Sequence, residues 1–168
     1  TLSNARRFFD GLQLNAGVTG MSVRNVSLWV DRGLPLQLTG ASGNDFNHVR
    51  LHSTSDGDLL KLTNAPRNHF SNTVIGEGSV SLQDSPGTVF DHTIVRTTRH
   101  VRAVTLVRSS DTVFNFCTVA HIRSAPGQAL GPDALVFAEQ GSSVVFTNSI
   151  LAAQDSLGSG GQAIRHPL

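Results

Sequence analysis

The chain has 168 residues, the length of about one domain, with a formal net charge of +1 and 15% charged residues. This balance argues against a broad electrostatic grip on nucleic acid, and no apolar run approaches the roughly 18 residues that a membrane span requires. The single cysteine, Cys117, excludes an intramolecular disulfide framework.

Residues 1–10 are predicted to form a short N-terminal capping helix. Ser3 is a suitable residue for the start of a helix, and the segment up to Asp10 contains Phe8 and Phe9. The repeats that follow indicate a solenoid, whose end exposes an apolar cross-section. A helix with these two phenylalanine rings would cover that end.

Residues 11–154 contain two short phrases that recur about every 24 residues. The first phrase opens on Val23, Phe46, Phe70, Phe90, Phe114 and Phe146, in steps of 23, 24, 20, 24 and 32 residues. The second phrase alternates apolar and polar residues and occupies 11–14, 35–38, 59–62, 79–82, 103–106 and 134–137. Its steps, 24, 24, 20, 24 and 31, change together with those of the first phrase, as expected if each repeat is one coil.

This alternation predicts three short strands per coil, and hence an all-β fold: a right-handed parallel β-helix, or solenoid, of about six coils. The first inward column consists of Leu14, Leu38, Leu62, Leu82, Leu106 and Phe137. The second consists of Val23 and the phenylalanines that open the first phrase. The third consists of Leu28, Leu51, Ile75, Val95, Val119 and Leu151.

A bend between the second and third strands repeats in every coil. It holds Asn25, His48, Asn72, His92, Phe116 and Asn148. Amides stacked about 4.8 Å apart can hydrogen-bond along the stack. This row resembles the asparagine ladder of pectate-lyase-like β-helices, and residues 11–152 share the repeat logic of that family. Phe116 breaks the row and is expected to stack on interior side chains, while Cys117 is expected to be a buried core residue.

The C-terminal residues 155–168 are predicted to be a linker or a partial last coil, and we expect the chain to be a fragment of a longer protein. Segment 155–161 is rich in Gly and Ser, as flexible linkers are. Insertions follow the third strand at 54–58, 97–102 and 121–133. Variable loops on one side of a solenoid are commonly its binding face.

The resemblance implies catalytic Asp, Arg, Lys or His residues on the outer side of the first strands. The two outward rows there contain no carboxylate, but Asp84, Arg108 and Glu139 follow at the turn in consecutive coils. Stacking would place the two carboxylates about 10 Å apart, near the upper range for inverting glycosidases. A surface ladder of alternating charge is the other interpretation.

A second candidate site consists of residues suited to stacking on sugar rings and pairing with uronate or sulfate groups. Its substrate-binding residues are predicted to be Trp29, His52, Lys61, Arg96 and His121. Solvated surface side chains are the alternative. No His, Asp or Glu spacing is diagnostic of a metal site, and no cofactor is expected.

Several outward positions are apolar, which is typical of an interface with a protein partner or a second copy. They are Val74, Val89, Ile94, Val113, Val145 and Ile150. A strand register shifted by one residue would also explain them. Such a shift would bury Arg50 and Arg96, so it is the less favoured interpretation.

Two functions remain open. The first is a β-helix module of a larger extracellular or cell-surface protein, which binds carbohydrate or a protein partner. The second is a polysaccharide lyase, hydrolase or epimerase domain acting on an acidic glycan, for which the support is the fold itself.

Overall fold

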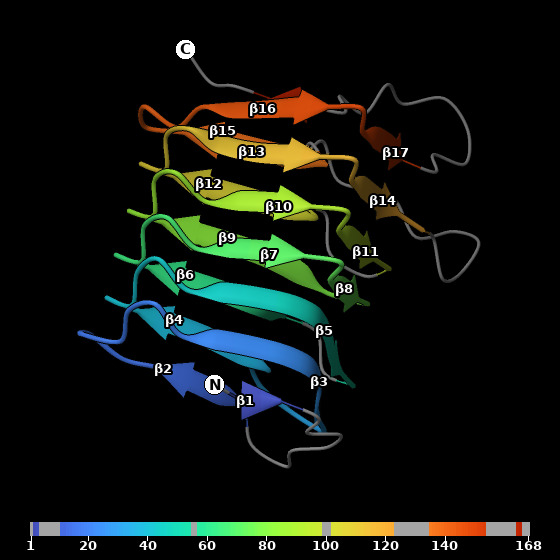
Figure 1. The fold of residues 1–168 in the computed structure, drawn as a ribbon. Coiled ribbons are helices and arrows are strands. Elements are labelled where there is room, and N and C mark those ends of the chain that lie inside the picture. The colour runs from blue at the N-terminus through green and yellow to red at the C-terminus, as the bar shows by residue number, and fades with distance from the viewer. Residues whose placement is uncertain are drawn as a thin grey trace.

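The computed structural model describes residues 2–3, 11–54, 57–98, 102–122, 135–153 and 164–165. In these residues the chain forms strands and turns and no helix, so none of them builds a helix that could cross a membrane. All strand pairings are parallel, and the strands stack as rungs from the N-terminal to the C-terminal end (Figure 1). The all-β solenoid expected from the repeats is therefore confirmed.

One sheet, the first sheet, contains the strands of the apolar-polar phrase. Its order is β2 (Leu12–Leu14), β4 (Leu36–Thr39), β6 (Asp58–Thr63), β9 (Ser79–Gln83), β12 (Val104–Val107), β15 (Val136–Glu139) and β18 (Ile164–Arg165). Each strand pairs with the strand of the next coil, so residues of one coil lie above their counterparts.

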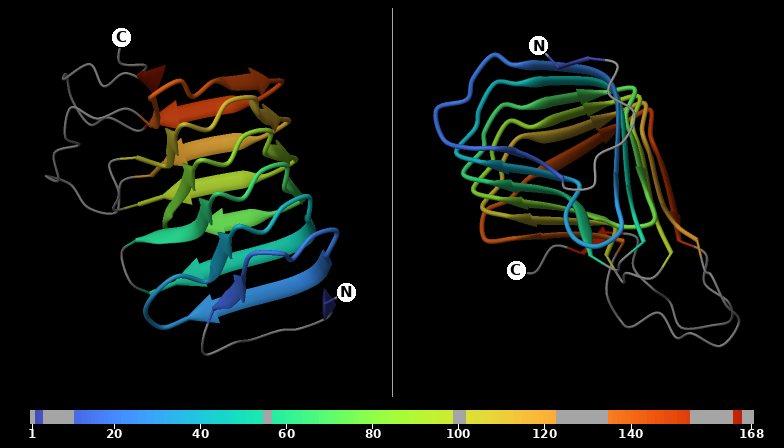
Figure 2. Two further views of the ribbon diagram at one scale, coloured as in Figure 1. Left: turned by 90° about the vertical axis from the view of Figure 1, so that its left-hand side faces the viewer. Right: turned by 90° about the horizontal axis from the view of Figure 1, so that it is seen from below.

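The other sheet has two arms that meet at β3 (Ser22–Val30) and β5 (Asp45–Ser53). The first arm, the second ladder, continues with β7 (His69–Ser71), β10 (Val89–Asp91), β13 (Thr112–Asn115) and β16 (Val144–Thr147). The other arm, the third ladder, continues with β8 (Val74–Gly76), β11 (Ile94–Thr97), β14 (Thr118–His121) and β17 (Ile150–Ala153). The view along the stack shows the coils superposed around one interior (Figure 2).

Four turns have the predicted three strands, rather than the six expected. They are β6–β7–β8, β9–β10–β11, β12–β13–β14 and β15–β16–β17. In the two N-terminal turns the second and third strands join into the nine-residue strands β3 and β5. The bend inside these long strands is one residue with a positive φ angle, so the ladder continues across it.

The second and third inward columns are confirmed by the strand register. The phenylalanine rings stack nearly parallel, with centroids 4.7, 5.1, 4.5 and 4.9 Å apart from Phe46 to Phe146. Phe46, Phe70, Phe90 and Phe114 are fully buried. No coil buries its own ring; each ring is covered by the rings of neighbouring coils.

The first inward column is confirmed from Leu14 to Leu106 but wrong at its last member. Leu106 pairs with Ala138, which is buried, and Thr105 pairs with Phe137. Phe137 therefore points outward, where the guanidinium of Arg102 lies 3.8 Å from its ring centroid. The small Ala138 takes the inward position, and the cation–π contact with Arg102 covers the outward Phe137 ring.

The bend residues form an exposed corner between the second and third ladders, rather than an internal asparagine ladder. We name this set the corner row: Asn25, His48, Asn72, His92, Phe116 and Asn148. Their φ angles lie between 48° and 54°, a left-handed conformation that Asn and His tolerate better than most residues. Phe116 stacks on the exposed His92, at 5.0 Å, and not on interior side chains as expected.

Internal polar ladders lie beside the corner and at the opposite turn. Cys117, which is buried as predicted, accepts from the Thr93 amide and donates to backbone oxygens of Phe90 and Asn115. Burial raises the pKa of this thiol. The backbone amide of Cys117 donates to Ser149 Oγ. At the opposite turn Asn44 and Asn68 form a buried amide pair. These contacts satisfy backbone groups that the turns leave unpaired.

Of the predicted N-terminal capping helix the structure describes residues 2–3 only, and these are not helical. Leu2 and Ser3 instead form strand β1, which pairs with Val23 and Arg24 of β3. Residues 4–10, the insertion residues 55–56, 99–101 and 123–134, and most of 155–168 lie outside the described residues.

Candidate functional site

The turn after the first sheet brings Asp84 and Arg108 together as predicted. Arg108 donates to Asp84 with both Nε and Nη2, at 2.6 and 2.8 Å, in a bidentate ion pair. Its Nη1 donates to Gln140 Oε1 at 2.7 Å. Arg108 thus links three consecutive coils, and Gln140 occupies the position where Glu139 was expected.

This geometry does not resemble a pair of catalytic carboxylic acids. Glu139 lies on β15 in register with Val107, outside the turn that holds Asp84. Hydrogen bonding to Arg108 lowers the pKa of Asp84, and the pKa of Arg108 is raised in return. A general acid needs a raised carboxyl pKa, so Asp84 has the opposite property. The observed contacts form a polar ladder on the surface, with Asp84, Arg108 and the neutral Gln140 in consecutive coils.

We expect Asp84→Asn to lower the melting temperature slightly, and only above acidic pH. The pKa of Asp84 is lowered in the folded state, so its stabilisation is present above about pH 4, where unfolded carboxyls titrate. It is lost as the pH falls through the folded-state pKa. Melting curves of both proteins between pH 3 and 8 measure this. In an Arg108→Gln background the difference should vanish; a difference that persists there would exclude the ion pair as its cause.

The third ladder brings together two of the predicted substrate-binding residues. Trp29 of β3 and His52 of β5 are paired in register, and their rings meet edge to face with centroids 4.5 Å apart and planes at 67°. Both side chains point outward, since the residues before them, Leu28 and Leu51, are buried. Trp29 keeps 43% of its surface exposed, so the indole remains accessible beside the imidazole.

Arg96 lies on the same outer face, two strands from His52. Gly76 of β8 pairs with both His52 and Arg96 and leaves a gap one strand wide between their side chains. A Cβ atom built on Gly76 would meet the Leu51 carbonyl oxygen at 4.0 Å, an ordinary contact, so the backbone there leaves space for at least a methyl group. Glu77 Oε1 lies 3.6 Å from Arg96 Nη2, an exposed ion pair at the rim of this gap. We name Trp29, His52, Gly76 and Arg96 the Trp29 face.

The structure does not bring Lys61 and His121 to the Trp29 face. Lys61 lies on β6 of the first sheet, between Gln37 and Ser81. His121 ends β14 with 5% of its surface exposed, on the inward side with the buried Thr97. The prediction had placed His121 in a surface loop, whereas strand β14 extends through it.

The outward apolar residues are confirmed as outward, and Arg50 and Arg96 are exposed, which excludes the one-residue shift. The outward apolar residues belong to two separate rows. Val74, Ile94 and Ile150 lie on the third ladder, while Val89, Val113 and Val145 lie on the second. The corner row separates them.

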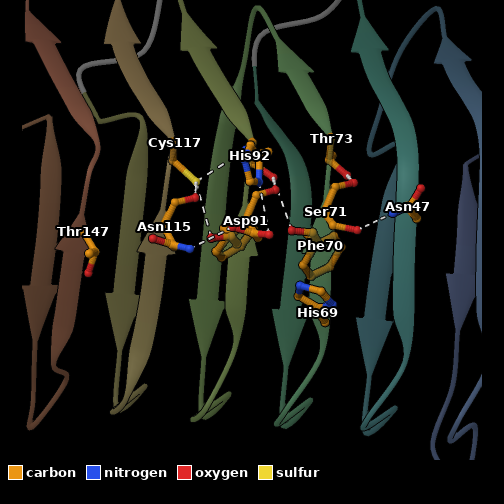
Figure 3. Close-up of polar contacts among 12 residues, drawn as sticks. Asn47, His69, Phe70, Ser71, Thr73, Asp91, His92, Asn115, Cys117 and Thr147 are labelled. Carbon is orange, nitrogen blue, oxygen red and sulfur yellow. Dashed lines mark hydrogen bonds and ion pairs between the residues drawn. The ribbon is translucent and has the colours of Figure 1, made fainter.

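Sequence reasoning missed a polar row on the outer face of the second ladder (Figure 3). It consists of Asn47, Ser71, Asp91, Asn115 and Thr147. Asn115 Nδ2 donates to Asp91 Oδ1 at 3.0 Å, and His92 Nδ1 lies 3.1 Å from Asp91 Oδ2. The register that turns each phenylalanine inward also turns the next residue outward, so this row was readable from the repeats.

In the part of the chain that the structure describes, no group of three or more His, Cys, Asp or Glu side chains is placed to hold a metal ion. Neither a protein-family model, nor a curated protein, nor a solved structure matches the chain. The likeness to pectate-lyase-like proteins therefore consists of the repeat pattern and the parallel solenoid alone.

Proposed function

We propose that this chain is a β-solenoid scaffold that binds carbohydrate through the Trp29 face. The observation that carries the proposal is the paired Trp29 and His52 rings beside the open gap at Gly76. An exposed indole supported by a second ring offers a flat apolar surface to the C–H face of a sugar. The missing side chain at Gly76 leaves space next to this stack, between His52 and Arg96.

Arg96 at the other edge of the gap favours a sugar with an anionic substituent. A guanidinium pairs with carboxylate or sulfate oxygens in a planar, two-bond geometry. Glu77 already neutralises part of this charge, at 3.6 Å. A uronate or sulfate group would compete with Glu77 for Arg96, so we expect moderate affinity and a marked dependence on salt.

Binding without turnover fits the surface better than catalysis. Hydrogen bonds from Arg108 lower the pKa of the Asp84 carboxyl, and Glu139 lies on β15 rather than in the same turn as Asp84. A module of this kind would belong to an extracellular or cell-surface protein. The exposed Val74, Ile94 and Ile150 support an additional contact with a protein partner or a second copy, which sedimentation velocity over a concentration range would detect.

A glycan array followed by calorimetric titration tests the proposal, using polygalacturonate, alginate and sulfated glycans beside neutral ones. We expect the unchanged chain to bind acidic glycans without releasing reducing ends or unsaturated products. Trp29→Ala and Arg96→Ala should each weaken binding at least about tenfold, because each removes one of the two anchoring groups.

Arg50→Ala is the charge-matched control, since Arg50 is an exposed arginine on the same ladder. Equal losses for Arg50→Ala and Arg96→Ala would reduce the effect to overall charge and contradict the proposed site. Glu77→Gln should tighten binding, because it releases Arg96. Turnover of a glycan that disappears in Asp84→Asn would establish the enzyme function instead.

A further inference from the structure

Phe116 stands out in the corner row because an aromatic residue occupies a position suited to Asn. Its φ angle is 50°, in the left-handed region that is sterically costly for bulky side chains. The ring is also 52% exposed, so it gains little from burial in return. A strained residue that contributes little to the core is a reason to look for a role in binding.

Residues of the preceding turn hold the Phe116 ring in place. Its ring stacks on His92 with centroids 5.0 Å apart and planes at 18°. His92 is in turn oriented by Asp91, whose Oδ2 lies 3.1 Å from Nδ1 of the imidazole. The backbone amides of His92 and Phe116 donate to Asn115 and Thr147 of the following turns, which fixes the corner.

Polar groups lie directly beside these rings on the second ladder. Asp91 and Asn115 precede His92 and Phe116 in the chain, are paired in register, and share a hydrogen bond of 3.0 Å (Figure 3). A carboxylate has about four acceptor positions. Asn115 and His92 use two of them on Asp91, whose side chain is 31% exposed, so acceptor positions remain. Two turns thus present a ring pair and an amide–carboxylate pair side by side.

We propose that Asp91, His92, Asn115 and Phe116, named the Phe116 ledge, form a second carbohydrate-binding site, which takes a neutral pyranose unit. The C–H face of the sugar packs against the accessible part of the Phe116 ring. Its hydroxyl groups donate to Asp91 and exchange hydrogen bonds with the Asn115 amide. The negative charge of Asp91 disfavours uronate and sulfate, which separates this ledge from the Trp29 face.

This inference rests on the proposed function, since it extends glycan binding to a second part of the surface. The test titrates the full chain with neutral gluco-, xylo-, manno- and galacto-oligosaccharides, and separately with oligogalacturonate. We expect at least one neutral series to bind. Phe116→Asn should weaken that binding at least about tenfold, because the apolar contact is lost. Trp29→Ala should leave it unchanged.

The melting temperature distinguishes a binding role from a structural one. Asn tolerates the left-handed conformation, so Phe116→Asn should raise the melting temperature, by about 2–4 °C, while it removes binding. Asn25→Gly is the matched control at the other end of the corner row and should leave affinity unchanged. A fall in melting temperature in Phe116→Asn would make Phe116 a structural residue and overturn the inference.

The two proposals can fail separately. Binding of oligogalacturonate that depends on Trp29 and Arg96, without binding of any neutral series, would leave the proposed function standing and overturn the ledge. Neutral oligosaccharide binding that persists in Phe116→Asn would overturn it as well. Binding of neutral sugars that is lost in Phe116→Asn, with no acidic glycan bound, would support the ledge and contradict the Trp29 face.

Discussion

Replacement of Phe90 by alanine should lower the free energy of unfolding by about 3–5 kcal/mol. Phe90 is fully buried in the middle of the ring column, with ring centroids 5.1 Å from Phe70 and 4.5 Å from Phe114. Its removal leaves a cavity between two rungs that are fixed by backbone hydrogen bonds and cannot close it. Urea unfolding followed by the fluorescence of Trp29, the single tryptophan of the sequence, measures the loss.

Two variants separate the contributions to this effect. Phe90→Leu fills most of the cavity without an aromatic face, so we expect a loss below about 1.5 kcal/mol. Phe146 lies at the C-terminal end of the column, is partly exposed, and stacks on Phe114. Phe146→Ala should therefore cost clearly less than Phe90→Ala. Equal losses at the two positions would show that ring stacking within the column does not set the stability of the solenoid.

The repeat pattern predicted the interior of this column well, for a physical reason. Side chains alternate between the two faces of a strand, so one buried position per strand determines all its neighbours. Phe46, Phe70 and Phe90 marked that position in coils of different length, and the pairing of their strands agrees with it. The same alternation correctly placed Trp29, His52 and Arg96 outward on the third ladder.

The error at the last coil was already visible in the spacing of the repeats. The step from Phe114 to Phe146 is 32 residues, and a step of 32 from Leu106 leads to Ala138, not to Phe137. The prediction chose Phe137 over Ala138 because a large apolar residue was expected in the core, although the spacing differed by one residue. The shift also moved Glu139 out of the turn and placed Gln140 against Arg108. The proposed catalytic pair therefore depended on the register of one coil.

The corner row could not be assigned from residue types alone. Asn is suited both to an internal amide ladder and to an exposed left-handed bend, and the sequence does not distinguish the two. The internal amide pair occurs instead at Asn44 and Asn68, where only two coils have Asn. Later coils have Thr88 and Thr112 there, whose hydroxyls donate within their own turns to the backbone oxygens of Ser85 and Ser109. A position whose residue type and hydrogen-bond partner change from coil to coil leaves no periodic signal.

Asn68→Ala should lower the free energy of unfolding by about 3–5 kcal/mol, although it removes a polar residue. Asn68 is fully buried; its Oδ1 accepts from the amide and the side chain of Asn44, and its Nδ2 donates to the oxygens of Ala41 and Ala65. Alanine leaves these groups without partners in the interior, at a cost of about 1–3 kcal/mol for each unsatisfied group.

Asn47→Ala is the matched control for Asn68→Ala, because Asn47 lies on the outer face of β5, where its side chain donates to Ser71 and contacts the exposed His48 imidazole. Water replaces these exposed contacts when they are lost, so the expected change is below about 1 kcal/mol. Urea unfolding of both variants measures the difference. Hydrogen exchange of the Asn44 amide, which donates to Asn68, locates it. The contrary result is an equal loss of unfolding free energy in both variants, with the Asn44 amide still protected in Asn68→Ala. Water would then have to replace the Asn68 side chain inside the turn. The cost of the substitution would then reflect packing rather than unsatisfied hydrogen bonds.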